Sequence, residues 1–177
     1  MIIKKNKKKI YSYKDLISIY KFDFVTKTKD VKKDFHKIIL KDAVMIIVKN
    51  EVNEILFVKQ YRPGVGKSVY ELPGGMVEKK ETPIIAAKRE LKEETGIQVK
   101  KIVKILNYYR HSGYNCGQDT IFFTKVLKKN IKSYSLDNEI LEIKWIDIKK
   151  LKSLIKKNYF ECPGTISSLL QYINFYF

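Results

Sequence analysis

Residues 75–97 read GMVEKKETPIIAAKRELKEETGI, and this stretch predicts a helix between Thr82 and Gly96. Thr82 suits the N-cap, and Pro83 suits the first helical position because its missing N–H is not needed there. Gly96 suits the C-terminal cap, since glycine adopts the left-handed backbone without strain. Ile84, Ala87 and Leu91 are three and four residues apart, so we expect them to face a core.

Alternating or apolar segments on both sides of this helix predict strands. Residues 16–28 and 35–40 predict an N-terminal antiparallel pair, and 43–48 and 55–60 a second hairpin across a turn at 50–54. Further strands are predicted at 69–72, 99–106, 120–127 and 140–146, and helices at 148–156 and 163–176. The expected fold class is α+β, an α/β/α sandwich with a mixed sheet. We divide it into an N-terminal β extension, 1–41, and a main domain, 42–177.

The chain has 177 residues and a formal charge of +17, and lysines outnumber arginines 33 to 3. Residues 1–41 hold 13 Lys against 4 Asp, which is +9. No aromatic-basic patch of the kind that stacks single-stranded bases is visible along the sequence, so we expect a generic solvated surface. A nucleic-acid partner stays open as an alternative because of the charge. Where lysine fills nearly every basic position, the planar guanidinium forks of Arg62, Arg89 and Arg110 point to phosphate or carboxylate contacts.

Cellular location is indicated by what the chain lacks. The longest purely apolar run, 43–48, is too short to cross a bilayer, and the basic N-terminus is not followed by the apolar stretch of a secretory signal. Cys116 and Cys162 form no CxxC or Cys/His pattern, so we expect free thiols and no zinc site. A cytoplasmic protein with no membrane partner is the expectation.

Three carboxylates gather near the end of the predicted helix. Glu90 and Glu94 lie about 40° apart on one face, and Glu93 lies about 60° from Glu90. Carboxylates this close repel one another unless a positive group lies among them, and oxygen ligands suit Mg²⁺ or Mn²⁺. The small side chains of Ala86 and Ala87 on the preceding turn would leave room for a ligand.

The spacing from Gly75 through Ile97 fits the pattern Gx5Ex7REUxEExGU, where U is a bulky aliphatic residue. This resembles the Nudix box of the Nudix hydrolases, which cleave nucleoside diphosphates linked to another moiety. The resemblance implies a Nudix-type α/β/α sandwich and metal ligands at the Gly74 carbonyl, Glu90, Glu93 and Glu94. Arg89 would hold Glu93 in place at i and i+4, and Glu81 would act as a supporting carboxylate.

Three further segments, QYRP at 60–63, ELPGG at 71–75 and CPGTI at 162–166, resemble the ADP-ribose pyrophosphatase branch. That resemblance implies a substrate contact at Arg62 and a homodimer built through the N-terminal strands. Phe22, Phe24, Val25 and Phe35 are also more apolar surface than a two-stranded ribbon can bury alone, which favours the same dimer.

Residues 109–119, YRHSGYNCGQD, depart from that branch, which usually has Ser-Pro-Gly followed by a glutamate as general base. Here the nearest carboxylate is Asp119, which is one methylene shorter. Either Asp119 or a box glutamate, Glu90 or Glu93, would be the base. Arg110 and His111 offer phosphate contacts, and Tyr114 offers a stacking surface.

The expected function is therefore that of a Mg²⁺- or Mn²⁺-dependent pyrophosphohydrolase acting on ADP-ribose or a related nucleoside diphosphate sugar. Two alternatives remain open at this point. One is a Nudix hydrolase for capped or 5′-phosphorylated RNA, which the charge would suit. The other is a non-catalytic ligand sensor, against which the full carboxylate set argues, because a sensor has no need of it.

Overall fold

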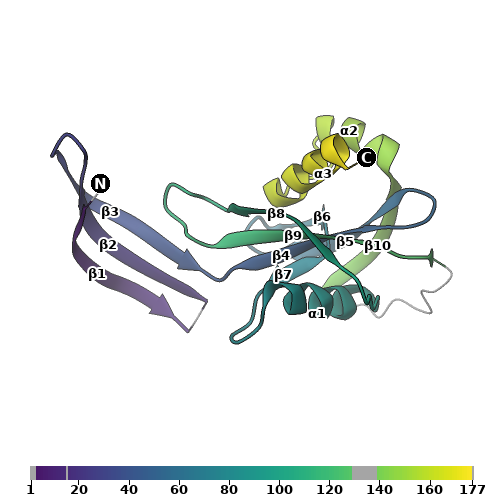
Figure 1. Cartoon of the computed structure of the whole chain (residues 1–177), viewed down its shortest axis with the longest axis horizontal. Helices are drawn as coiled ribbons and strands as arrows, with labels where there is room; N and C mark the ends of the chain where they lie inside the picture. The colour runs from purple at the N-terminus through teal and green to yellow at the C-terminus, as the bar shows by residue number, and fades with distance from the viewer. Residues whose placement is uncertain (1–2, 15, 129–138, 177) are drawn as a thin grey trace. The chain divides into compact units, whose positions relative to one another are not determined.

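A computed structural model describes residues 3–14, 16–128 and 139–176 of the chain (Figure 1). The chain divides into two compact units. Unit 1 comprises residues 1–42 and 108–118, and unit 2 comprises residues 43–107 and 119–177. Unit 1 therefore contains the N-terminal extension and also the segment in which the sequence departs from the ADP-ribose pyrophosphatase pattern.

Unit 1 is an antiparallel sheet of three strands, β1 (Ile3–Tyr13), β2 (Ile17–Val25) and β3 (Val31–Leu40), in the order β1-β2-β3. The predicted pair corresponds to β2 and β3. Strand β1 was not predicted, because five lysines in residues 4–9 mask any alternation of apolar and polar side chains. The segment 108–118 joins the edge of this sheet, where the Ile38 N–H donates to the Tyr114 carbonyl and the Cys116 N–H donates to the Ile38 carbonyl.

The pairing of these strands gathers cationic side chains around one aromatic ring, which the sequence does not show. The ammonium groups of Lys7 and Lys9 lie 4.5 and 5.6 Å from the ring centroid of Tyr20. Lys37 is paired with Tyr20 across β2 and β3. These residues are far apart in the sequence, and only the pairing of the three strands gathers them.

Unit 2 is built on a mixed sheet in the order β10-β5-β4-β9-β8, with β6 paired to β5 and β7 paired to β4. Its strands are β4 (Ala43–Lys49), β5 (Glu54–Arg62), β6 (Lys67–Glu71), β7 (Gly74–Met76), β8 (Val103–Tyr109), β9 (Gln118–Lys125) and β10 (Ile140–Asp147). The β4–β9 pair is parallel, whereas β10–β5, β5–β6 and β4–β7 are antiparallel. The predicted mixed sheet is confirmed. The predicted strand at 99–106 begins later than expected, at Val103, and the one at 120–127 begins earlier, at Gln118.

Helices cover both faces of the sheet in unit 2. Helix α1 (Pro83–Thr95) lies on one side, and α2 (Ile148–Lys156) and α3 (Pro163–Phe175) lie on the other (Figure 1). This arrangement is the predicted α/β/α sandwich, in which each helix buries one apolar stripe against the sheet. Among these three helices of the described chain, none combines the length and apolarity that a membrane span requires.

Helix α1 packs on alternate residues of β4. Val44, Ile46 and Val48 share one buried cluster with Leu91 of α1 and Phe122 of β9. On the other face, Phe57 stacks on Phe160 at 4.7 Å and Phe123 on Tyr172 of α3 at 5.0 Å between ring centroids. Burying each such side chain stabilises the fold by roughly 1.5–3 kcal/mol, so β4 and α1 are held rigidly together.

The predicted apolar stripe of α1 is partly wrong. Ala87 and Leu91 are fully buried as expected, but Ile84 is 44% exposed. Periodicity gives the direction of a side chain, and it does not show whether a neighbouring surface extends as far as the first turn. Ala86 is also fully buried. The two alanines therefore allow α1 to approach the sheet closely, and they do not open space for a ligand.

Candidate metal and diphosphate site

The site begins with the glycine pair in β7. Gly74 is paired with Met45 of β4, and Gly75 with Val44. A side chain at Gly74 would overlap the Val44 carbonyl, so only glycine allows the two strands to come this close. After β7 the chain runs through a short loop into α1, and Thr82 and Gly96 stand at the two ends of that helix as predicted. The Gly96 N–H donates to the Lys92 carbonyl, with Gly96 at a left-handed φ of 71°.

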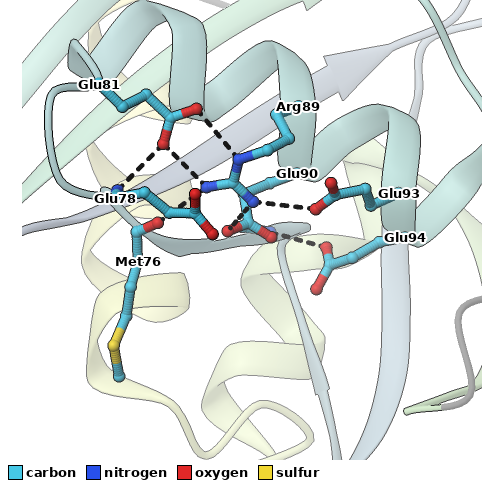
Figure 2. Close-up of polar contacts among 8 residues, drawn as sticks. Met76, Glu78, Glu81, Arg89, Glu90, Glu93 and Glu94 are labelled. Carbon is cyan, nitrogen blue, oxygen red and sulfur yellow. Dashed lines mark hydrogen bonds and ion pairs between the residues drawn. The ribbon is translucent and has the colours of Figure 1, made fainter. Parts of the chain in front are cut away.

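Arg89 is the centre of the loop-helix (Figure 2). Its Nε and Nη2 donate to the two carboxylate oxygens of Glu81, each at 3.0 Å, and Nη2 also donates to the Met76 carbonyl at 3.0 Å. Its Nη1 donates to Glu90 at 2.8 Å and to Glu93 at 2.9 Å. These bonds use every donor that a guanidinium has. The predicted Arg89–Glu93 pair is present in the structure.

The three acidic partners of Arg89 differ in their environments. The side chains of Glu81 and Glu90 are 10% and 14% exposed, whereas that of Glu93 is 50% exposed. The hydrogen bonds from Arg89 hold the pKa of Glu81 below its usual range. Glu81 therefore stays ionised and keeps Arg89 fixed, and it acts from the loop as a positioning residue.

Glu90 lies directly against Gly75. A Cβ on Gly75 would overlap the carboxylate group of Glu90, so the glycine leaves the space that this carboxylate occupies. Burial raises the pKa of Glu90, and the hydrogen bond and charge of Arg89 oppose that shift. The carboxylate is thus pressed between the backbone of β7 and the guanidinium, with little water to solvate it.

Glu94 is the most deeply buried carboxylate of the helix, with 7% of its surface exposed. Its Oε2 accepts a hydrogen bond from the Gly74 N–H at 2.8 Å. Burial raises its pKa to about 8, the Gly74 N–H opposes this shift, and the charge of Glu90 adds to it. A positive ion between Glu90 and Glu94 would offset both the burial and the mutual repulsion.

The donor set of this site fits a hard divalent cation. Carboxylate and carbonyl oxygens are the ligands that Mg²⁺ and Mn²⁺ prefer, and Glu90, Glu93 and Glu94 provide more negative charge than Arg89 alone offsets. Within the described ranges, no three His, Cys, Asp or Glu side chains are already gathered closely enough to hold a metal ion. Arg89 and the Gly74 N–H hold the glutamates apart, so metal binding would require their side chains to turn toward a common point.

Arg62 meets an acidic partner at the end of β5. Its Nε and Nη2 lie 2.7 and 2.6 Å from one oxygen of Glu71, and Gln60 donates to the same oxygen at 3.1 Å. Glu71 is largely buried, but the Arg62 side chain is 44% exposed. The guanidinium of Arg62 is therefore fixed on one side by Glu71 and remains partly accessible to solvent. The charge of Arg62 lowers the pKa of Glu94, and the charge of Glu71 raises it. The Arg62–Glu71 pair therefore lies in the same electrostatic environment as Glu94.

Glu71 is a residue to which the sequence analysis gave no role. The signal was available in ELPGG, where a single carboxylate ends a strand shortly before the glycine pair. The pairing of β5 with β6 brings Glu71 opposite Val58, two residues before Gln60. Register between strands was needed to connect Glu71 with Arg62.

Asp119 lies within a strand, whereas the predicted strand begins only at residue 120. It is the second residue of β9, it is 2% exposed, and its register partner in β4 is Ala43. Ala43 is in turn paired with Met76 of β7. Asp119 is therefore fixed in the sheet. Two strand pairings connect it to Met76, whose carbonyl accepts a hydrogen bond from Arg89.

The other predicted contact residues belong to unit 1. The Nη2 of Arg110 is 3.5 Å from the Lys41 carbonyl. The rings of His111 and Tyr114 are stacked at 5.4 Å with an interplanar angle of 11°, and Tyr114 is 50% exposed. The predicted stacking surface at Tyr114 is thus accessible within its own unit.

Comparison with known proteins agrees with this geometry. The family model for the NUDIX domain matches residues 39–162. The chain is 33% identical over 113 residues to an ADP-ribose pyrophosphatase of Bacillus subtilis, covering 62% of this chain and 61% of the relative. It is 35% identical over 103 residues to an ADP-ribose pyrophosphatase of Saccharomyces cerevisiae, covering 55% and 45%. A methanol dehydrogenase activator of Bacillus methanolicus is 33% identical over 97 residues, covering 55% and 52%.

The matched region spans between about half and six-tenths of the length of the Bacillus relatives. The family match over residues 39–162 includes the loop-helix with Arg89 and its glutamates, the Arg62–Glu71 pair and the sheet that carries Asp119. Because the domain match covers well over half of the chain and includes every element of the carboxylate site, the chain belongs to the Nudix family, in which it resembles the ADP-ribose pyrophosphatase branch.

Proposed function

We propose that the chain is a Mg²⁺- or Mn²⁺-dependent pyrophosphohydrolase that cleaves the diphosphate of ADP-ribose or a related nucleoside diphosphate sugar. The observation that carries this proposal is a pair of carboxylates, the half-buried Glu90 and the buried Glu94, held against Gly75 and Gly74. Such a pair is costly in a stable fold unless a cation binds there in function. The names of the two ADP-ribose pyrophosphatase relatives supply the substrate class.

Glu90, Glu93, Glu94 and the Gly74 carbonyl would hold the metal. A bound divalent ion would offset the charge of the diphosphate and acidify the attacking water. Arg89 keeps Glu90 and Glu93 on one side of the helix, and both would turn from the guanidinium toward the metal when it binds. Arg62 would contact the diphosphate through the donors that Glu71 leaves free.

In the reaction, a water oxygen forms a bond to one phosphorus, and the bond from that phosphorus to the bridging oxygen breaks. The products are a nucleoside monophosphate and a sugar phosphate. The proton of the water passes to a carboxylate, which we assign to Asp119, with Glu90 or Glu93 as the alternative base. Arg110 and Tyr114 would contact the substrate on the side of the nucleoside or sugar.

We also propose a cytoplasmic homodimer that associates through residues 1–41. The supporting feature is an apolar stripe of cross-strand pairs on one face of the unit 1 sheet, Ile17 with Leu40 and Ile19 with Ile38. Tyr11 and Tyr13 of β1 extend it, since they are paired with Ile19 and Ile17. Phe22 adds little, because it is only 5% exposed and already packs on Phe35.

One substrate panel tests the proposed chemistry. Turnover of ADP-ribose, GDP-mannose and capped RNA would be compared at moderate salt with Mg²⁺, with Mn²⁺ and with EDTA. We expect a nucleoside diphosphate sugar to be cleaved fastest and EDTA to abolish the reaction. The charge of +17 keeps capped RNA as the second candidate, and a clear preference for it would replace the nucleotide sugar. Binding without turnover of any substrate would indicate a ligand sensor.

A further inference from the structure

We propose that one face of the unit 1 sheet binds a single-stranded nucleic acid. The face is defined by Tyr20, Phe22 and Phe24 of β2, which alternate along the strand and so point to the same side. Lys9 of β1 and Lys37 of β3 are the register partners of Tyr20. Residues directly opposite on neighbouring strands share a face, so aromatic rings and ammonium groups are interleaved across three strands.

Positive charge is concentrated in this unit beyond the lysine-rich bias of the chain. Residues 1–41 carry +9, from 13 Lys and 4 Asp, while the remaining 136 residues carry the other +8. The ammonium groups of the exposed Lys7 and Lys9 lie within 6 Å of the Tyr20 ring centroid. A polyanion that approaches Tyr20 therefore meets two flexible cations at once, and its bound counterions would be released.

A hollow of about 290 Å³ continues the face beyond Tyr20. Phe22, Phe24 and Phe35 line it from the sheet, and Tyr114 lines it from the segment 108–118. The ring centroids of Phe22 and Phe24 lie 5.3 and 5.4 Å from that of Phe35. Lys37 also lines the hollow. Rings on a sheet with a cation beside them offer a stacking platform for a base and a partner for its phosphate.

The geometry favours a single strand over two other polyanions. In a duplex the bases are stacked on each other and unavailable to rings that line a hollow. An anionic bilayer presents a broad surface to protruding apolar side chains, whereas Phe22 is 5% exposed, and Phe35 and Tyr114, at 36% and 50%, line a hollow that a broad surface would not fill. Unpaired bases can enter the hollow while the lysines contact the backbone on either side. This binding function lies in unit 1 and needs no residue of the carboxylate helix, and Tyr114 is the residue that it shares with the proposed substrate contacts.

Fluorescence anisotropy with a labelled oligo(dT) or oligo(rU) of about 12 nucleotides tests this proposal on the full chain. We expect a dissociation constant of roughly 1–100 µM at about 150 mM salt, and at least about 10-fold weaker binding of a duplex of equal length. The double variant Lys7→Gln, Lys9→Gln should weaken single-strand binding by about 10-fold. It should also lower the slope of log K against log salt by about 1.4, which is about 0.7 for each lost phosphate contact.

The matched control is Lys149→Gln with Lys152→Gln, which removes the same charge from exposed positions of α2 in unit 2 and should change binding by less than about 2-fold. Tyr20→Leu should cost about 5-fold or more through lost stacking, and Tyr20→Phe should bind as the parent does. Equal binding of strand and duplex, or equal loss in the two lysine pairs, would overturn the proposal. So would tighter binding to phosphatidylserine vesicles than to the oligonucleotide, which would assign the face to a membrane.

Discussion

The carboxylate of Glu90 occupies the space beside Gly75 in which a Cβ would lie, so any side chain at position 75 would overlap it. Gly75→Ala should therefore push Glu90 out of its position between β7 and Arg89. We expect turnover to fall by about 10²-fold or more, because a metal ligand displaced by about an ångström loses most of its effect. The measurement is kcat with saturating Mg²⁺.

Gly64→Ala is the matched control for Gly75→Ala. A Cβ at Gly64 meets no atom within 4 Å, so this variant should retain parental turnover. Equal activity of the two alanine variants would mean that the position of Glu90 is unimportant for the reaction.

Glu90→Gln and Glu94→Gln should each reduce turnover by at least about 10²-fold while leaving the melting temperature unchanged or raised. The amide keeps the shape of the side chain and removes a charge that burial and crowding disfavour, as the raised pKa of both carboxyls indicates. The two measurements are turnover with saturating Mg²⁺ and thermal unfolding in the absence of metal. Near-normal activity of either variant with saturating Mg²⁺ would remove that residue from the metal site.

Asp119→Ala should lower kcat strongly with little change in KM, as expected when an interaction made only in the transition state is lost. Because Asp119 is 2% exposed, Asp119→Asn is needed to separate loss of charge from loss of packing. Asp119→Glu tests whether a longer carboxylate can act from the same strand, and a rate at or above that of the parent would support a base here. If Glu90→Gln or Glu93→Gln does much greater damage than Asp119→Asn, the base lies in the helix.

The stability of unit 2 should decrease with acid in a way that depends on Glu54. Hydrogen bonds from Lys128 at 2.6 Å and Asn50 at 2.8 Å hold the pKa of Glu54 below its ordinary value of 4.5. A carboxyl with a lowered folded pKa stabilises the fold above its unfolded pKa, and this contribution is lost as the pH falls through the folded pKa. We expect the free energy of unfolding to fall below about pH 4.5, and to fall less steeply in Glu54→Gln.

Urea unfolding at several pH values between about 3 and 6 measures this dependence. Lys128→Gln removes the main donor to Glu54, so it should flatten the acid limb in the same way. A parental slope in both variants would show that Glu54 contributes nothing to the acid sensitivity.

A dimer should be observed by light scattering at micromolar protein concentration. Ile19→Lys places a charge in the apolar stripe that Ile19 shares with its cross-strand partner Ile38, and we expect it to yield monomer. Ser18→Lys introduces the same charge on the opposite face of β2 and should remain dimeric. A stable monomer for the parent chain would contradict the homodimer, and dissociation by both variants would locate the contact elsewhere.

Much of the loop-helix could be predicted because its determinants are local. Thr82, Gly96 and the Arg89–Glu93 pair depend on residues at most one helix length apart, so spacing along the chain is sufficient. The partner of Arg62 could not be identified in this way, since Glu71 reaches it through the pairing of β5 with β6. The first strand was missed because its lysines hide the alternation that reports a strand, and its pairing with β2 is the stabilising feature.

The parallel pairing of β4 and β9 has a consequence for how the molecule folds. It joins Ala43 to Asp119, residues 119 − 43 = 76 positions apart, whereas the bonds of Arg89 span at most 13. Closing a long loop costs more conformational entropy than closing a short one, and distant pairings therefore form late. We expect the contacts of the carboxylate helix with its neighbouring loop to form before the strand that carries Asp119 docks.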